Sequence, residues 1–262
     1  PVSPHEIQPH PYGVELGRLM KMLNYTEYKT LQAFLTKEFT RVGPGTAKQI
    51  CENAALLPKT KPSKMSREMA EQLMKGIRET KIMNPPTDCI SPIGQELLEK
   101  GLKKEINAEF YASTTRPPAV YRGNPFAIEA AIAYGGNLPA EGSVEINRFA
   151  NRVPLLYQQG ACAITKCVGK TNWRAYGLKQ SGSSVPQGPC VILVHMASVW
   201  VPFTSEAKEA VAHYPEIMKE VRLALQEVGR ELGKYLNKKR RLKKELTKVD
   251  YISKYLPFVG EA

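Results

Sequence analysis

Paired cysteines, long apolar runs and a signal peptide are all missing from this sequence. Its five cysteines are scattered and include no C-x-x-C pair, which argues against a zinc ribbon and against a secreted disulfide scaffold. No stretch approaches about 18 uninterrupted apolar residues, so we expect no membrane span. The first residues contain neither an initiator methionine nor a charged-then-apolar signal. We therefore expect a cytoplasmic protein, and we interpret the chain as a segment of a longer one.

Sequence signatures of a self-sufficient active site are also absent. The GPGTAK stretch at 43–48 does not match the P-loop pattern, and H-E-x-x-H and G-x-S-x-G do not occur. His5, His10 and His213 have no cysteine or carboxylate neighbours at ligand spacing. His195 lies in the apolar run VILVHMAS, where a hydrogen-bonded core histidine is more usual than a catalytic one. We expect no catalytic residue and no metal site in this chain.

Acidic residues are few relative to basic ones. The formal net charge is +12 and the pI is near 9.4, while 42% of the residues are hydrophobic, as in a folded protein. The charge is concentrated at 237–248, NKKRRLKKELTK, which carries seven basic side chains and one acidic. This run indicates contact with a polyanion, with nucleic acid the first candidate, and a solvated charged helix face is the alternative.

The first part of the chain, up to about residue 83, has apolar residues three and four positions apart, which predicts a small all-helical module. The stretch TRVGPGTAK at 40–48 contains a Gly-Pro-Gly turn that lets two helices meet at a sharp angle. Its amides could contact a DNA backbone beside Arg41 and Lys48, or the stretch could be only a tight turn. NPPTD at 84–88 interrupts the pattern and is the expected domain boundary.

Beyond this boundary the pattern changes, and the whole chain is predicted to be α+β. Ser91 as N-cap and Pro92 at the first position predict a short helix. Strand-like runs separated by Pro- and Gly-rich turns follow at 105–113, 127–136, 144–157 and 190–201. A helical stretch at 160–178 lies between the last two and predicts a β-α-β crossover. Pro215 opens a helix of about 30 residues with one apolar stripe.

Single basic residues stand out in the second part. With Ser205 as an N-cap, Lys208 would occupy the third helical position, where the helix dipole disfavours a cation unless an anion lies beyond it. We interpret Lys208 as a phosphate-contacting lysine, with an ordinary exposed lysine as the alternative. Arg148 and Arg152, four positions apart, are predicted to share one strand face. The rival candidates for phosphate contact are Lys170 and Lys179.

Six sequence blocks, taken in order, carry a family resemblance. They are PHPYGVELGRLMKML, FLTKEFTRVGPGTAKQICENAAL, SPIGQELLEKGLKKEINAEFYASTTRPPAVYRGNPFAIEAAIAYGG, EINRFANRVPLLY, TNWRAYGLKQ and VPFTSEAKEAVAHYPEI. Together they resemble the B subunits of archaeal DNA topoisomerase VI over nearly the whole chain. The resemblance implies a helix-two-turn-helix domain at 1–86. It further implies a mixed β-α-β transducer domain at 87–262, with a four-stranded sheet and a long C-terminal stalk helix from about 215.

The resemblance also implies a function. These B subunits belong to an ATP-dependent type II DNA topoisomerase, an isomerase that relaxes supercoiled DNA by double-strand passage. In that family, ATP with Mg²⁺ is bound mainly by an N-terminal GHKL domain, which this sequence does not contain, so we expect the segment alone to be inactive. The family's switch lysine, which reaches the γ-phosphate of ATP, falls on Lys208 by the block VPFTSEAKEAVAHYPEI. The segment would couple the nucleotide to movement of the DNA-cleaving A subunit.

The partners that the resemblance implies are double-stranded DNA, the A subunit of the same enzyme, and a second B subunit. They would form a heterotetramer of two A and two B subunits in the archaeal cytoplasm, associated with the nucleoid and not with a membrane. The candidates for contact with DNA or with the A subunit are Lys238, Lys239, Arg240 and Arg241.

Two alternatives come from other classes of protein. A DNA-repair glycosylase also uses a helix-two-turn-helix module and an N-terminal proline nucleophile. Here, however, Pro1 is followed by Val2 in place of glutamate, and a four-cysteine zinc finger is missing. A non-enzymatic nucleic-acid-binding protein would fit the charge, but it gives no reason for the arrangement of strand, loop and lysine around Lys208.

Overall fold

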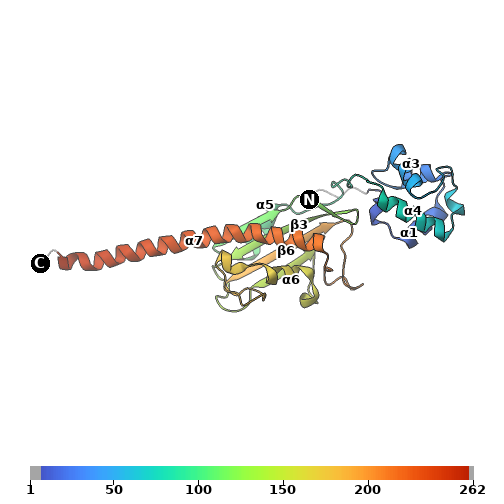
Figure 1. Cartoon of the computed structure of the whole chain (residues 1–262). Helices are drawn as coiled ribbons and strands as arrows, with labels where there is room; N and C mark the ends of the chain where they lie inside the picture. The colour runs from blue at the N-terminus through green and yellow to red at the C-terminus, as the bar shows by residue number, and fades with distance from the viewer. Residues whose placement is uncertain (1–6, 260–262) are drawn as a thin grey trace. The chain divides into compact units, whose positions relative to one another are not determined.

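The chain forms two compact units, and the structure, a computed structural model, describes residues 7–259 (Figure 1). Each unit is assembled from more than one chain segment. The first takes the residues up to Ser91, 118–127 and 198–200, and the second takes 92–117, 128–197 and the residues from 201 onward. Within the described residues, no helix combines the length and the apolar character needed to cross a membrane.

Short helices build the first unit, as the apolar spacing predicted. They are η1 (Pro11–Gly13), α1 (Leu16–Tyr25), α2 (Leu31–Glu38), α3 (Pro44–Asn53), η2 (Pro62–Lys64) and α4 (Arg67–Glu79). Side-chain N-caps fix where two of these helices begin. Thr30 Oγ1 accepts the Ala33 N–H at 3.2 Å before α2, and Ser66 Oγ accepts the Met69 N–H at 3.3 Å before α4.

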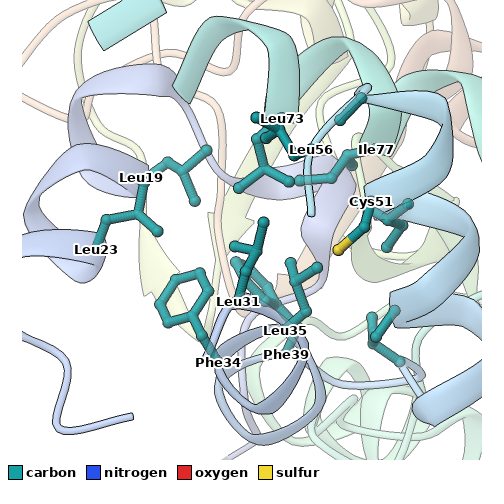
Figure 2. Close-up of a cluster of buried hydrophobic side chains, with 14 of the residues drawn as sticks. Leu19, Leu23, Leu31, Phe34, Leu35, Phe39, Cys51, Leu56, Leu73 and Ile77 are labelled. Carbon is teal, nitrogen blue, oxygen red and sulfur yellow. The ribbon is translucent and has the colours of Figure 1, made fainter. Parts of the chain in front are cut away.

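Apolar side chains from these helices meet in one core. Leu19 of α1, Phe34 of α2 and Leu73 of α4 are each 0% exposed, and Figure 2 shows them converging. Burial of such side chains contributes about 1.5–3 kcal/mol each. Gly76 allows α4 to approach α3 closely, because a Cβ at that position would lie 2.6 Å from the Cβ of Ala54.

A mixed sheet with the strand order β1-β3-β6-β4-β5 is the main framework of the second unit, although β2, the first residues of β3 and Ser198 of β6 are counted with the first unit. The strands are β1 (Phe110–Thr115), β2 (Ala119–Tyr121), β3 (Asn124–Tyr134), β4 (Glu145–Ala150), β5 (Val153–Pro154) and β6 (Cys190–Ser198). The helices that follow or precede them are α5 (Gln95–Glu105), η3 (Gln159–Ala161), α6 (Ala163–Lys170), η4 (Trp173–Tyr176) and α7 (Pro215–Val259).

The pairing of these strands confirms the α+β class. β1 and β3 pair antiparallel, β4 and β6 pair parallel, and α6 lies on the connection between β4 and β6. The predicted β-α-β crossover is therefore confirmed. The four expected strands are the long ones, β1, β3, β4 and β6. The sheet also contains two short strands that we did not predict as separate elements, β2 against β3 and β5 against β4.

Strand β1 shows how helices cover both faces of the sheet. Tyr111 packs in the cluster of α5, and Ser113 Oγ donates to a carbonyl of the same helix. The alternate residues Thr114 and Arg116 point the other way and both bind Glu227 of α7. Helix α6 packs against α7, so these two helices lie on one face and α5 on the other.

The start of α5 differs from the prediction. Ser91 is not its N-cap, because the helix begins at Gln95. The carboxylate of Glu129 on β3 accepts the N–H groups of Ile93 at 2.8 Å and Gly94 at 2.7 Å. A buried side chain from the sheet thus satisfies the amides that a local cap would have taken.

Candidate functional site: a lysine hairpin and a basic helix end

Residues 202–212 form a short hairpin between β6 and α7. The Thr204 N–H donates to the carbonyl of Ala210 at 2.9 Å and joins the two arms. At the tip, the Lys208 N–H donates to the carbonyl of Ser205 at 3.2 Å, which closes a tight turn. The structure therefore places Lys208 at the exposed end of a hairpin.

Lys208 does not lie in a helix, contrary to the sequence-based expectation. Helix α7 begins only at Pro215, as the proline itself predicted, so the helix-dipole argument does not apply to Lys208. The backbone of Lys208 has φ 56°, in the left-handed region, which costs a non-glycine residue roughly 1–2 kcal/mol. A lysine thus occupies a backbone conformation that glycine or asparagine would adopt at a lower cost in conformational free energy. Such strain clusters at ligand clamps and switch segments.

The base of the hairpin is fixed to α6. Val211 is fully buried, its carbonyl accepts the Ala163 N–H at 2.9 Å, and its N–H donates to Cys162 Sγ at 3.4 Å. The chain then enters α7, whose Met218 N–H donates to the carbonyl of Tyr214 at 2.9 Å. The hairpin therefore has an exposed tip, a buried base and a direct path into α7.

The rival lysines lie in different settings. Lys170 is the last residue of α6 and is exposed. Lys179 is also exposed, and its carbonyl accepts the Gln187 N–H at 2.8 Å. Neither has a left-handed backbone, and neither lies at the tip of a hairpin.

The basic run at 237–248 occupies the part of α7 that continues past the sheet of its own unit (Figure 1). Lys239 Nζ pairs with the carboxylate of Glu109, which also accepts the Tyr235 hydroxyl at 3.0 Å. The hydrogen bond from Lys239 lowers the pKa of Glu109, and the same bond raises the pKa of Lys239. The charge of Lys239 is therefore matched within this unit.

The four predicted contact residues cannot all face one surface, because successive residues of an α-helix are about 100° apart. Lys239 points back towards Glu109, so Arg241 lies on the opposite side of α7. Lys244 and Lys248 are three and seven positions after Arg241 and share its face. We did not predict these two, although the helical period identifies them. The other predicted residues, both exposed, are Lys238 and Arg240.

An apolar stripe lies beside this basic face. Leu242, Leu246 and Val249 follow each other at helical spacing and are 50%, 68% and 58% exposed. They continue the spacing of the buried stripe that packs α7 on its own unit. They are exposed because the helix has run past the sheet that covers the earlier residues.

The predicted arginine pair does not share a strand face. Asn151 and Arg152 have φ 46° and 68° and form the tight turn that joins β4 to β5. The strand ends before Arg152, and the prediction was therefore wrong. Arg148 is buried, and its Nη2 donates to the carbonyls of Leu155 at 2.7 Å and Tyr157 at 2.9 Å.

His195 is a hydrogen-bonded core histidine, as expected. Its Nε2 accepts the Arg152 N–H at 3.0 Å, so the ring is neutral and donates from Nδ1 to Glu129 at 2.7 Å. Glu129 also accepts the hydroxyl of Thr115 at 2.7 Å. Burial acts to raise the pKa of Glu129, but the hydrogen bonds from His195, Thr115 and the amides before α5 outweigh it and hold the pKa below its ordinary value.

The remaining sequence-based candidates stay predictions. Gly43 and Pro44 form the start of α3, and Lys48 makes an exposed pair with Glu52 at 3.8 Å, which leaves a DNA contact there open. Among the side chains that the structure describes, no group of three or more His, Cys, Asp or Glu is placed to hold a metal ion. Among the residues named in the sequence analysis, Pro1, Val2 and His5 lie outside the described residues.

Comparison with known proteins identifies the family. Residues 85–248 match the family model described as topoisomerase VI B subunit, transducer. The chain belongs to the topoisomerase VI B-subunit family. It is 52% identical over 261 residues to the B subunit of type 2 DNA topoisomerase 6 from Methanococcoides burtonii, a match that covers 100% of this chain and 42% of that protein. The corresponding protein of Archaeoglobus fulgidus is 47% identical over 261 residues, covering 100% of this chain and 43% of that protein.

This topoisomerase VI B-subunit segment spans less than half the length of these relatives. Among solved structures, the B subunit of DNA gyrase from Myxococcus xanthus aligns with a TM-score of 0.35 and 14% identity over 52% of this chain and 43% of that one. That likeness is too low to carry an argument. The family match favours neither the glycosylase nor the non-enzymatic alternative.

Proposed function

We propose that this segment couples ATP binding and hydrolysis to DNA strand passage in an ATP-dependent type II topoisomerase. In this proposal, residues 1–86 are the helix-two-turn-helix domain and 87–262 the transducer. ATP and Mg²⁺ are held mainly by a GHKL domain outside the segment. The partners are double-stranded DNA, the A subunit, and a second B subunit, in a cytoplasmic heterotetramer. The observation that carries the proposal is the hairpin that presents Lys208.

The setting of Lys208 suits contact with a terminal phosphate. Its ammonium is a compact charge on a flexible stem, and a charge-assisted hydrogen bond to a γ-phosphate is lost when that phosphate leaves. The buried base at Val211 ties the hairpin to α6, and the hairpin leads within a few residues into α7. A change of force at the tip is therefore transmitted to the start of the long helix.

The test compares Lys208→Ala with Lys170→Ala in the whole B subunit, in complex with the A subunit. Removal of a preorganised cation from a developing phosphate charge costs on the order of a hundredfold in rate, so Lys208→Ala is expected to lower ATP turnover by about that factor. Lys170 is an exposed lysine of the same unit and serves as the charge-matched control. Binding of DNA without ATP should be equal in both variants. Equal ATP turnover in the two would refute the role of Lys208.

The far part of α7 supports the proposed partners. We assign the basic face of Arg241, Lys244 and Lys248 to DNA, and the apolar stripe that begins at Leu242 to the A subunit. In the assembled enzyme, Arg241→Ala should weaken DNA binding and reduce the slope of log affinity against log salt concentration by about 1. Because Glu109 already matches the charge of Lys239, Lys239→Ala should change the affinity and the slope only slightly. An equal loss in both variants would contradict this assignment of faces.

A further inference from the structure

The end of strand β1 is bound to α7 by four polar side chains, Thr114, Arg116, Glu220 and Glu227, here called the β1–α7 clamp. Arg116, directly after the strand, donates from Nε to Glu220 at 3.2 Å and from Nη1 to Glu227. The other carboxylate oxygen of Glu227 accepts the Thr114 hydroxyl. Glu220 and Glu227 are seven positions apart, so they lie on one face of α7 about two turns from each other. One guanidinium therefore bridges two turns of the helix.

The β1–α7 clamp is sheltered from solvent. The side chain of Arg116 is 22% exposed, and those of Glu220 and Glu227 are 15% and 30% exposed. Exposed ion pairs contribute little, whereas a sheltered, charge-assisted contact made by the guanidinium fork is strong and directional. Without Arg116, two carboxylates would be left near each other with like charges. The contact therefore depends on this one cation.

The buried side chains in this part of α7 are apolar. Ile217, Val221 and Leu225 are each 0% exposed. Apolar burial keeps the helix on its layer, but it is non-directional and does not by itself fix the position of the helix along the strand. A planar guanidinium donates only in fixed directions, so Arg116 supplies the directional contact at this point.

The strand side of the β1–α7 clamp is itself firmly held. The Arg116 N–H donates to the carbonyl of Ile128 on β3 at 2.9 Å. Thr115, between the two strand residues of the clamp, donates to Glu129, whose carboxylate also holds the amides before α5. A force on the start of α7 is therefore passed through Arg116 to the sheet and to α5.

The helix side of the β1–α7 clamp lies close to the hairpin of Lys208. The hairpin, residues 202–212, ends three positions before α7 begins at Pro215. Glu220 lies within the first two turns of the helix. The clamp is thus placed where a movement of the hairpin enters α7.

We infer that Arg116 is a positioning residue for the coupling step, because it locks the start of α7 to β1 and makes the helix and the sheet move together. The inference rests on the proposed function, since the force is taken to come from a phosphate contact at Lys208. Without the lock, α7 slides or tilts on its non-directional apolar contacts, and the movement of the hairpin is absorbed at the start of the helix.

The ratio of strand passage to ATP hydrolysis tests the inference in the assembled enzyme of A and B subunits. Arg116→Gln removes the charge and the fork, and Lys234→Gln, which removes the cation of an exposed pair with Glu231 on the same helix, is the matched control. We expect Arg116→Gln to hydrolyse ATP at nearly the original rate but to relax about tenfold fewer plasmid molecules per ATP, within the usual range of coupling between two sites. Lys234→Gln should keep the original ratio.

An unchanged ratio in Arg116→Gln overturns the inference. A merely structural role would lower both rates together and leave the ratio as it was. If Arg116→Gln does not fold, Arg116→Lys takes its place with the same criterion, because lysine keeps the charge but lacks the fork that binds both carboxylates.

Distances between spin labels test the lock itself. All five cysteines of this segment are buried, so labels can be placed at Leu97→Cys on α5 and Lys219→Cys on α7, both exposed, once the other cysteines of the enzyme are replaced by serine. With Arg116 present we expect one narrow distribution. In Arg116→Gln it should shift or broaden by about 3 Å, two residues of helical rise. The same narrow distribution in both proteins overturns the inference.

The outcomes separate this inference from the proposed function. A broadened distribution in Arg116→Gln, together with normal ATP turnover in Lys208→Ala, supports the lock and refutes the role of the lysine. An unchanged distribution, together with reduced ATP turnover in Lys208→Ala, overturns the lock and leaves the proposed function in place.

Discussion

Replacement of Glu129 by glutamine is expected to destabilise the second unit by about 3–6 kcal/mol, because a buried carboxylate then no longer accepts all of its hydrogen bonds. The carboxylate is 0% exposed and accepts hydrogen bonds from Ile93 N, Gly94 N, Thr115 Oγ1 and His195 Nδ1. Glutamine keeps the shape, but its NH₂ group faces donors that need an acceptor. Each hydrogen bond to a charged group is worth about 1.5–3 kcal/mol, so loss of two accounts for the expected effect.

The same substitution should change the dependence of stability on pH. Because the folded chain holds the pKa of Glu129 below its ordinary value, the ionised carboxylate stabilises the fold. This stabilisation is present above the unfolded-state pKa of about 4.3 and is lost as the pH falls through the lower folded-state value. Glu129→Gln lacks this contribution, so its free energy of unfolding should fall less steeply in acid than that of the original chain.

Urea unfolding followed by tryptophan fluorescence measures both effects. Trp173 is fully buried in the second unit, and with Trp200→Phe in the first unit it reports on the second alone. Glu109→Gln is the control, because Glu109 also has a lowered pKa but its partner Lys239 lies in an exposed pair that contributes little. If the glutamine variants at 129 and 109 unfold at the same urea concentration at pH 7, the reasoning about the buried network is wrong.

Two further predictions concern packing. Gly76→Ala should destabilise the first unit by about 1–3 kcal/mol, because the new Cβ would lie 2.6 Å from the Cβ of Ala54. In Gly17→Ala, the new Cβ in α1 meets no atom within 4 Å, so this substitution should stabilise the first unit by up to about 1 kcal/mol. If the two substitutions shift the thermal unfolding temperature in the same direction, the packing argument is contradicted. Burial raises the pKa of the Cys51 and Cys167 thiols to about 11, and a thiol reagent at pH 8 should modify neither before the chain unfolds.

Much of the fold was predictable because its signals are local. The helical spacing before residue 83, the four long strands and the start of α7 at Pro215 all depend on neighbouring residues. The start of α5 was not predictable in this way. Its amides bind Glu129, which lies 35 positions from Gly94 and reaches them only through the folded sheet.

The candidate site was predictable only in part. Lys208 stood out as a cation at an expected helix N-terminus, but its actual setting is a hairpin tip with a left-handed backbone. Arg152 was placed on a strand because alternation cannot show where a strand turns back. Which face of α7 carries the unpaired basic side chains depends on the ion pair between Lys239 and Glu109, which are 130 positions apart. Each failure comes from a long-range contact or a turn that no local period reveals.

Helix α7 has the length of a lever arm. It runs unbroken for 45 residues, or roughly 68 Å at 1.5 Å per residue. Arg116, the residue directly after β1, pairs with Glu220 and Glu227 in the first third of the helix. Beyond the pair of Lys239 with Glu109, about 30 Å of helix remain, so a tilt of roughly 5° there would move the far end by roughly 3 Å. In the proposed function, loss of the phosphate contact at Lys208 would thus be magnified at the far end of α7 into a step of about 3 Å, close to the roughly 3.4 Å spacing of DNA base pairs.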